Sequence, residues 1–249
     1  MIGHPKHVAK ALEAGVDIIC AQGGEAGGHT GAYLLLFLQF WFHSVPTSIL
    51  IPEVAKLVQG KKSPLNGQPV YVVAAGGIYC GKSLAAALMF GAQAVWVGTR
   101  FVCATEAGAS KSHQQAIIES TYDETIRTLI FTGRPLRVRK NPYIMNWETE
   151  RREEMHSLLD SGVLPITHDL ELVEKLEEQN KSKEEVNSSL AGKLGGLDID
   201  DVERPYLMGE VAAAIQDIKP AKEIIDEMIK EAVQQLRLGS SFLESGSRL

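Results

Sequence analysis

Three apolar segments, each followed by a loop, constrain the fold of this chain more than any other feature. They are VDIICA at residues 16–21, PVYVVAA at 69–75 and AVWVGT at 94–99. Their continuous, partly β-branched apolar character is typical of strands in a covered parallel sheet. Helical patterns alternate with them, at residues 5–15, 47–60 and 82–92. Because strands and helices alternate, the sequence predicts an α/β fold with a parallel sheet.

Short strands with chemistry-bearing loops at their C-terminal ends are typical of a TIM-type βα barrel. A complete barrel has eight βα units in about 250 residues, whereas only three units are visible here. We therefore expect an incomplete barrel over residues 1–145. Its absent strands would leave four apolar residues uncovered, which are Val16, Ile18, Val72 and Val95.

Beyond about Gly108 we expect no further strand, and the remaining patterns are helical. Helices are expected at residues 145–162, 182–190 and 219–238, within a helical region that covers residues 146–249. The last helix is amphipathic. The residues expected on its inner face are Ile224, Ile225, Met228 and Val233.

The composition favours a soluble protein that handles a small molecule. The formal net charge of -6 argues against a nucleic-acid surface. Cys20, Cys80 and Cys103 lack a CxxC spacing and suit a reducing compartment, so we expect a cytoplasmic location. The most apolar segment, residues 32–45, is shorter than the roughly 20 residues of a membrane helix, and no membrane span is expected. Nothing here indicates an oligomeric state.

Glycine-rich loops follow the predicted strands, at the edge of a parallel sheet where ligands bind. Gly76 and Gly77 follow the second strand, and Gly98 and Thr99 follow the third. These strands are expected to be neighbours. Backbone N–H groups of paired loops, together with the N-terminus of a following helix, can then converge on one anion. The pattern favours a phosphate site, and the alternative is that the glycines only form turns.

The loop after the first strand, GGEAGGHTG at residues 23–31, places Glu25 and His29 four residues apart. Its glycines allow unusual backbone conformations, and they will not hold the helix that an i, i+4 metal pair requires. No third ligand is evident, so no metal site is predicted. His29 can be a general acid or base, or an ordinary structural histidine.

The segments AQGGEAGGHTG, at residues 21–31, and VVAAGGIYCGKSLAAALMFGAQAVWVGTRF, at 72–101, resemble the signature segments of the nitronate monooxygenase family. Members of that family, formerly called 2-nitropropane dioxygenases, are FMN-dependent βα-barrel enzymes. The resemblance implies oxidation of alkyl nitronates or nitroalkanes with O2 to carbonyl compounds and nitrite. It is less specific for the substrate, because flavin-dependent enoyl-acyl-carrier-protein reductases share a similar EAGGH loop.

The resemblance also implies roles for individual residues. His29 would be the catalytic acid/base near the flavin, and Glu25 would be structural. Backbone groups of the second and third loops would hold the FMN phosphate. The residues implied in cofactor binding are Gln22, Gly27, Gly76, Gly77, Trp96, Val97, Gly98 and Thr99.

Two features depart from the family pattern. Family members have a further N-terminal part that supplies the first strands, so this chain would hold the last three βα units. Residues 32–45 stand where the family has a short linker, and we interpret them as an insertion. An inactive truncated member is therefore one alternative to an active nitronate monooxygenase. A flavin-dependent enoyl-acyl-carrier-protein reductase-like enzyme that uses NAD(P)H is the other.

Overall fold

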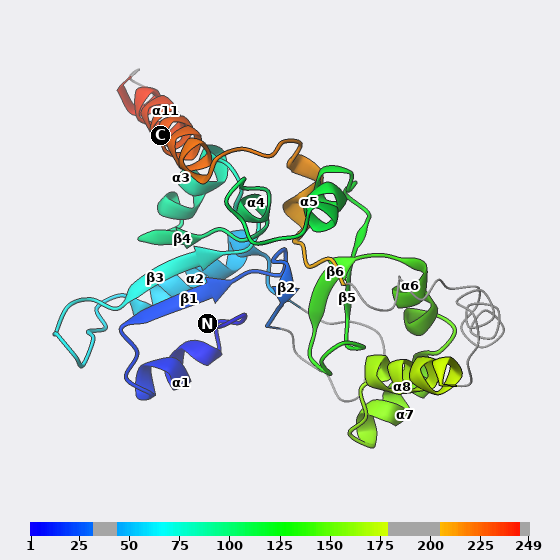
Figure 1. Ribbon diagram of the computed structural model, residues 1–249. Helices are drawn as coiled ribbons and strands as arrows, with labels where there is room; N and C mark the ends of the chain where they lie inside the picture. Colours follow the sequence, from blue (N-terminus) through cyan, green and yellow to red (C-terminus); the bar gives the residue numbers. More distant parts are fainter. Residues whose placement is uncertain (32–43, 179–204, 245–249) are drawn as a thin grey trace. The chain divides into compact units, whose positions relative to one another are not determined.

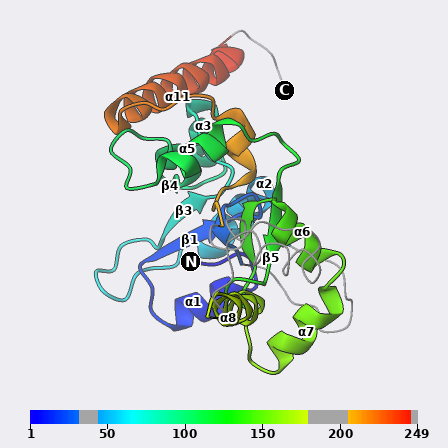
Figure 2. The ribbon, with the colours of Figure 1, turned by 45° about the vertical axis from the view of Figure 1, so that its right-hand side comes forward.

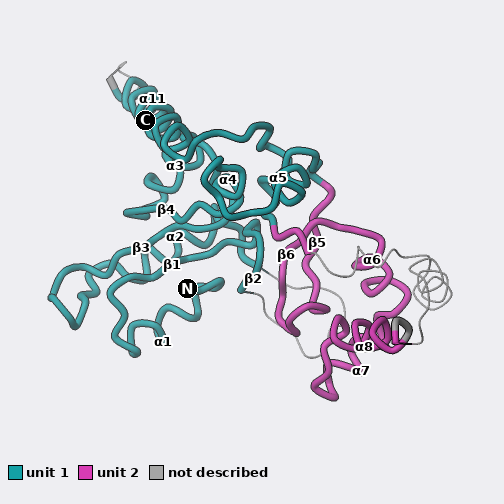
Figure 3. The backbone as a smooth tube through the Cα atoms, in the orientation of Figure 1, with its two compact units in different colours: residues 1–122, 208–249 teal, residues 123–207 magenta. Residues whose placement is uncertain are grey.

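The computed structural model describes residues 1–31, 44–178 and 205–244. The chain forms two compact units, residues 1–122 with 208–249 and residues 123–207 (Figure 3). The helix expected at residues 182–190, and residues 32–43 of the segment interpreted as an insertion, lie outside the described residues.

A parallel sheet of three strands forms the centre of the first unit (Figure 1). The strands are β1 (Ile18–Gln22), β3 (Tyr71–Ala75) and β4 (Ala94–Trp96), in the order β1-β3-β4. The central strand pairs in parallel with both of its neighbours. The predicted α/β fold with a parallel sheet is therefore confirmed.

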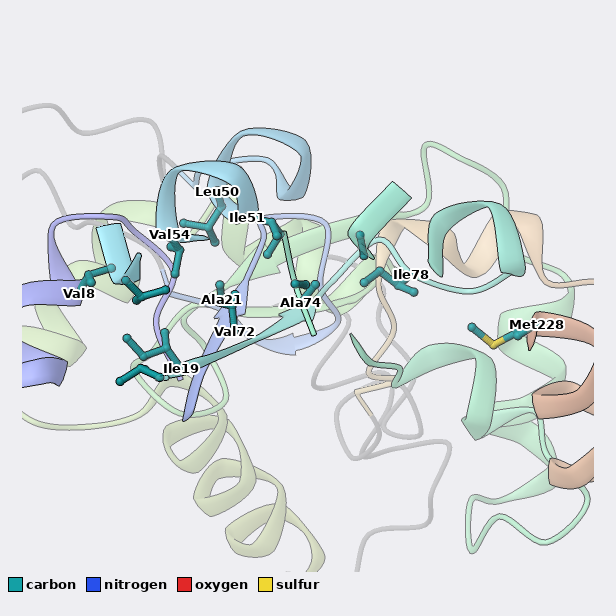
Figure 4. Close-up of a cluster of buried hydrophobic side chains, with 14 of the residues drawn as sticks. Val8, Ile19, Ala21, Leu50, Ile51, Val54, Val72, Ala74, Ile78 and Met228 are labelled. Atoms are coloured by element: carbon teal, nitrogen blue, oxygen red, sulfur yellow. The ribbon is translucent and has the colours of Figure 1, made fainter. Parts of the chain in front are cut away.

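Helices α1 (His7–Glu13), α2 (Thr47–Val58) and α3 (Gly81–Met89) accompany the strands. Side chains of α2 pack against those of β1 and β3 in one hydrophobic cluster (Figure 4). Burial of each valine, leucine or isoleucine side chain in this cluster contributes roughly 1.5–3 kcal/mol. The buried residues at this contact are Leu50, Ile51 and Val54 of α2 with Ile19, Ala21, Val72 and Ala74 of the strands.

The opposite face of the same sheet is partly exposed. Ile18, Tyr71 and Trp96 are 56%, 42% and 62% exposed. Side chains alternate between the two faces of a strand, and the register aligns Ile18 with Tyr71 but Ile19 with Val72. The expected exposure of Ile18 is confirmed. The expected exposure of Val72 is wrong, since this side chain is 1% exposed and lies on the face that α2 covers. Two further residues that were expected to be uncovered, Val16 and Val95, are partly buried.

Helix α2 begins directly after Pro46 and has no cap from its own side chains. The sequence favours Thr47 or Ser48 as the cap, with Pro52 near the first turn. This interpretation is wrong, because Thr47 is already helical and Pro52 lies inside the helix. Instead, the carboxylate oxygens of Glu25 accept the N–H of Thr47 at 3.1 and 3.0 Å. A carboxylate in this place also meets the partial positive charge of a helix N-terminus.

Helix α11 (Ala221–Glu244) packs against α3 (Figures 1 and 2). A Cβ on Gly81 would lie 2.4 Å from the carbonyl oxygen of Met228, so only glycine permits this approach. Ile224 and Met228 are buried as predicted. Ile225 and Val233 were expected to face inward, and this is wrong, since they are 46% and 40% exposed. Among the described residues of α11, only one stripe, with residues four positions apart such as Ile224 and Met228, is buried where α11 packs against α3.

Shorter elements complete the first unit. Helix α5 (Lys111–Ile118) is capped by Ser110, whose hydroxyl accepts the N–H of His113 at 3.1 Å. Its Gln114 amide donates to the carbonyls of Val102 and Ala104, both at 3.0 Å. The short elements are β2 (Gly28–His29), α4 (Thr99–Val102), α5 (Lys111–Ile118) and the 3-10 helix η1 (Glu210–Ala214).

The second unit contains an antiparallel pair of strands, β5 (Thr125–Thr128) and β6 (Leu136–Arg139). The prediction that no strand follows Gly108 is therefore wrong. β-Branched residues in the segment TIRT favour a strand, and Gly133, with φ +66°, lies in the connection between the two strands. The strand signal in this segment covers only four residues, and a strongly helical sequence follows, so the strand was missed.

Helices α6 (Pro142–Glu148), α7 (Arg152–Asp160) and α8 (Pro165–Glu177) follow these strands. The one helix expected at residues 145–162 is thus two helices, α6 and α7, with a break between them. Among the described residues, no helix is both long enough and apolar enough to cross a membrane.

A buried carboxylate, Asp169 of α8, organises these helices. The Tyr143 hydroxyl and the Trp147 indole N–H each donate to its Oδ2 at 3.0 Å. Arg151 donates to both of its oxygens, at 2.9 and 3.0 Å, and its guanidinium lies 3.4 Å from the centroid of the Trp147 ring. Burial, and next the Asp169 charge, raise the pKa of Tyr143, so its hydroxyl stays a donor. Asp169 therefore accepts from Tyr143, Trp147 and Arg151 at once, and the His168 Nδ1 atom lies 3.2 Å from its Oδ1.

We expect Asp169→Asn to lower the free energy of unfolding by about 1–3 kcal/mol, because the amide group replaces one acceptor oxygen with a donor. Urea unfolding followed by circular dichroism measures the change. The control is Asp160→Asn, at the exposed end of α7, which we expect to change stability by less than about 0.5 kcal/mol. Equal stability of the two variants would contradict the proposed importance of the buried carboxylate.

Candidate functional site

The three loops that the sequence singled out leave the sheet at the same edge. The pairing register aligns Gln22 with Ala75 and Ala75 with Trp96, which are the last residues of β1, β3 and β4. The predicted adjacency of the second and third strands is confirmed. Because all three strands run in parallel, the loops that follow them start side by side.

The first loop is fixed by contacts on both of its sides. Besides the Thr47 N–H, the Glu25 carboxylate accepts the Thr47 hydroxyl at 2.9 Å. The Glu25 backbone carbonyl accepts the N–H of Glu210 at 3.0 Å. A Cβ on Gly27 would lie 2.4 Å from the backbone of Met208 and of Gly209. In this structure, the bare backbone at Gly27 is required by that neighbouring segment.

His29 lies at the exposed end of this loop. It follows Gly28, which has φ +67°, a conformation that favours glycine. The Gln22 side-chain amide donates to the His29 backbone carbonyl at 3.0 Å. Gln22 therefore ties the end of β1 to the backbone that carries the imidazole. The hydroxyl of the next residue, Thr30, is buried and has no hydrogen-bond partner within the described chain.

The second loop presents unpaired backbone donors. Gly76 and Gly77 have φ +86° and +72°, so both residues need glycine. Within the described residues, the N–H groups of Gly77 and Ile78 donate to no acceptor. Since such groups are normally paired unless water or a ligand takes their place, they are candidates to bind an anion.

The N-terminus of the next helix, α3, is already occupied by a side chain. The Glu231 carboxylate of α11 accepts the N–H groups of Gly81 and Lys82 at 2.7 and 3.3 Å. An anion at the second loop would therefore depend on the loop donors themselves. Only the tertiary structure shows this, because Glu231 lies far along the chain.

The third loop, Val97 and Gly98, leads into α4. Within the described chain, the N–H groups of Gly98 and Thr99 also donate to no acceptor. A Cβ on Gly98 would meet nothing within 4 Å, so the space beside this backbone is open. Thr99 is 9% exposed, whereas Trp96 is 62% exposed and Val97 packs partly against the core. The open space and free donors can accommodate a phosphate.

One segment that sequence reasoning missed, residues 208–217, contacts both the first and the third loop. Gly209 donates its N–H to the Thr99 hydroxyl oxygen at 2.9 Å. Asp217 accepts the buried Arg100 guanidinium, through its side chain at 2.6 Å and its carbonyl at 2.9 Å. The only sequence signal for this role was a glycine, Gly209, between larger residues. Among the described residues, no group of three or more His, Cys, Asp or Glu could hold a metal ion.

The fold and these loops define an α/β protein in which functional loops follow the strands of a parallel sheet. The family model described as nitronate monooxygenase matches residues 1–231. The chain therefore belongs to the nitronate monooxygenase family, whose members are flavin-dependent oxidoreductases.

The chain is also similar to individual proteins, over different shares of their length. The chain is 28% identical to the (3aS,4S,5R,7aS)-5-hydroxy-7a-methyl-1-oxo-octahydro-1H-indene-4-carboxyl-CoA dehydrogenase of Mycobacterium tuberculosis, over 98% of this chain and 67% of that protein. It is 35% identical to the protein named "Probable nitronate monooxygenase" of Staphylococcus saprophyticus, over 58% of this chain and 38% of that one. The structure of FabK from Thermotoga maritima shares the fold, with a TM-score of 0.64 at 24% identity, over 97% of this chain and 62% of that chain. This chain spans about two thirds or less of each of these proteins.

Proposed function

We propose that this chain is the cofactor-phosphate and acid/base part of an FMN-dependent oxidoreductase of the nitronate monooxygenase type. Its reaction would convert alkyl nitronates or nitroalkanes with O2 into carbonyl compounds and nitrite. The observation that carries the proposal is the placement of four unpaired backbone donors on adjacent strand ends. They belong to Gly77, Ile78, Gly98 and Thr99.

The residues present fit the phosphate of FMN. Unpaired N–H groups are the donors that phosphate oxygens accept, and charge-assisted hydrogen bonds of this kind are the strong ones. The open space at Gly98 leaves room for the anion beside them. The rest of the cofactor would lie beside Gln22, Gly27, Trp96 and Val97. Gly76 would lie next to the Gly77 donor.

His29 would hold and move the proton in this reaction. When bound, the flavin supplies the electron acceptor. His29 would take the proton from the carbon next to the nitro group of a neutral nitroalkane, whereas a nitronate has already lost it. Gln22 would keep the imidazole in reach through its bond to the His29 carbonyl. Glu25 would remain structural.

The exposed sheet face supports the proposal that this chain is the last three units of a βα barrel. Parallel sheets are normally covered on both faces, yet Ile18, Tyr71 and Trp96 are exposed here. Further strands of a closed barrel would cover them. In this proposal residues 1–145 belong to the barrel, residues 146–249 to the helical region, and residues 32–45 to an insertion.

A second candidate function is oxidoreduction of an acyl thioester, as in a flavin-dependent enoyl-acyl-carrier-protein reductase. The relative named as a carboxyl-CoA dehydrogenase supports it, because the similarity covers 98% of this chain. Consumption of NAD(P)H with an enoyl thioester, without nitrite release from propyl nitronate, would favour this candidate over the first.

The visible spectrum of the purified chain tests the proposal. FMN is added, excess is removed by gel filtration, and we expect flavin absorption to stay with the protein. Nitrite release from propyl nitronate then distinguishes the first function from the second. A colourless protein would overturn the proposal and identify an inactive family member.

A further inference from the structure

The peptide between Gly76 and Gly77 carries a donor on one side and an acceptor on the other. In a trans peptide, the C=O of one residue and the N–H of the next point in opposite directions. The carbonyl of Gly76 accepts the Thr47 hydroxyl at 2.9 Å, while the N–H of Gly77 donates to nothing in the described chain. The direction of the free N–H is therefore set by what holds the carbonyl.

The backbone on both sides of this peptide has few intrinsic conformational limits. Both residues are glycines with positive φ, and glycine populates many backbone conformations at little cost. A Cβ on Gly77 would meet its nearest protein atoms at 3.6 Å, whereas one on Gly76 would lie 3.0 Å from the carbonyl oxygen of Gly23, so the backbone is more open on the Gly77 side of this peptide. Within the described chain, the Thr47 hydroxyl is the group that bonds to the Gly76 carbonyl.

The Thr47 hydroxyl has one hydrogen and two acceptors, the Gly76 carbonyl and the Glu25 carboxylate, each at 2.9 Å. The carboxylate also accepts the Thr47 backbone N–H through both of its oxygens. Because that backbone N–H already binds Glu25 to the start of α2, the hydroxyl hydrogen can go to Gly76 without loss of the Glu25 contact. In this arrangement Glu25 holds Thr47 in place, and Thr47 holds the peptide.

We infer that Thr47 is a positioning residue for the phosphate site: its hydroxyl fixes the Gly76 carbonyl and thereby aims the Gly77 N–H at the phosphate of the cofactor. The inference rests on the proposed FMN site. It links the loop of Glu25 and His29 to the loop that binds phosphate, through one side chain at the start of α2.

Comparison of FMN with riboflavin, which lacks the phosphate, tests this inference. Dissociation constants of both are measured by flavin fluorescence for the wild-type chain, Thr47→Val and Thr47→Ala. We expect loss of the hydroxyl to raise the dissociation constant of FMN about tenfold and to change that of riboflavin by less than about twofold. Two substitutions are used so that the result does not depend on how valine fits.

Matched controls separate this effect from general damage. Thr47→Ser keeps the hydroxyl and should retain the wild-type preference for FMN, as should Ser48→Ala at the exposed neighbouring position. If FMN binding and riboflavin binding weaken equally, or if the ratio of their dissociation constants stays unchanged in both variants that lack the hydroxyl, the inference about Thr47 is wrong. The proposed phosphate site is not contradicted by either result. A wild-type chain that does not prefer FMN would overturn the proposed phosphate site, and the inference with it.

Discussion

Replacement of Gly98 by valine is expected to weaken FMN binding at least about 100-fold, which corresponds to about 2.7 kcal/mol, without loss of the fold. Gly98 has φ −99° and ψ −78°, at the border of the right-handed helical region and not in the left-handed region, and its Cβ would meet no protein atom within 4 Å. The new side chain would instead fill the space beside the N–H groups of Gly98 and Thr99. Fluorescence titration with FMN measures the affinity, and thermal melting checks the fold.

Gly108 provides the matched control for this substitution. A Cβ there would also meet nothing within 4 Å, but the residue does not belong to the loops at the sheet edge. Gly108→Val should therefore bind FMN like the wild type. Equal losses in the two variants, or full FMN binding by Gly98→Val, would contradict the prediction of a phosphate beside Gly98. Gly77→Val is less informative, because φ +72° would strain valine in any case.

Replacement of His29 by asparagine should lower kcat/KM for a neutral nitroalkane by roughly 10²–10⁴-fold. The reason is that asparagine cannot take the proton from the carbon next to the nitro group. A preformed nitronate has already lost that proton, so its kcat/KM should fall by less than about tenfold in the same variant. Nitrite release from nitropropane and from propyl nitronate measures both values.

The difference between the two substrates separates a proton-transfer role from a binding role. If His29 only bound the substrate, both would lose activity to a similar extent. His156→Asn, at an exposed position of α7, is the control and should retain wild-type rates with both. FMN affinity of His29→Asn should be unchanged, since the imidazole is not among the proposed phosphate donors.

Local patterns in the sequence predicted the central part of the first unit. Continuous apolar runs identified β1, β3 and β4, and their alternation with helices implied a parallel sheet, because βα connections leave few other arrangements. The second unit was predicted less well. The strands β5 and β6 each have four residues, too few for a reliable period, and the surrounding helical sequence outweighed them.

The candidate site was likewise predicted in part: its residues could be identified from the sequence, but the contacts that hold them could not. Gly76, Gly77, Gly98 and His29 stood out because glycine clusters and a histidine after apolar runs are local signals. Their placement along one edge then followed from strand order. Which groups hold them could not be read from the sequence, because those contacts cross long stretches of chain.

The sequence by itself therefore determined the parallel sheet, the family and the residues that carry the proposed chemistry. Only the tertiary structure decided that Glu25 caps α2, that Glu231 occupies the start of α3 and that Gly209 bonds to Thr99. It also decided that the Thr47 hydroxyl bonds to the Gly76 carbonyl, on the peptide whose Gly77 N–H has no acceptor within the described residues. The physical reason is that periodicity and propensity act over a few residues, whereas a polar group takes whichever partner the folded backbone brings within about 3 Å.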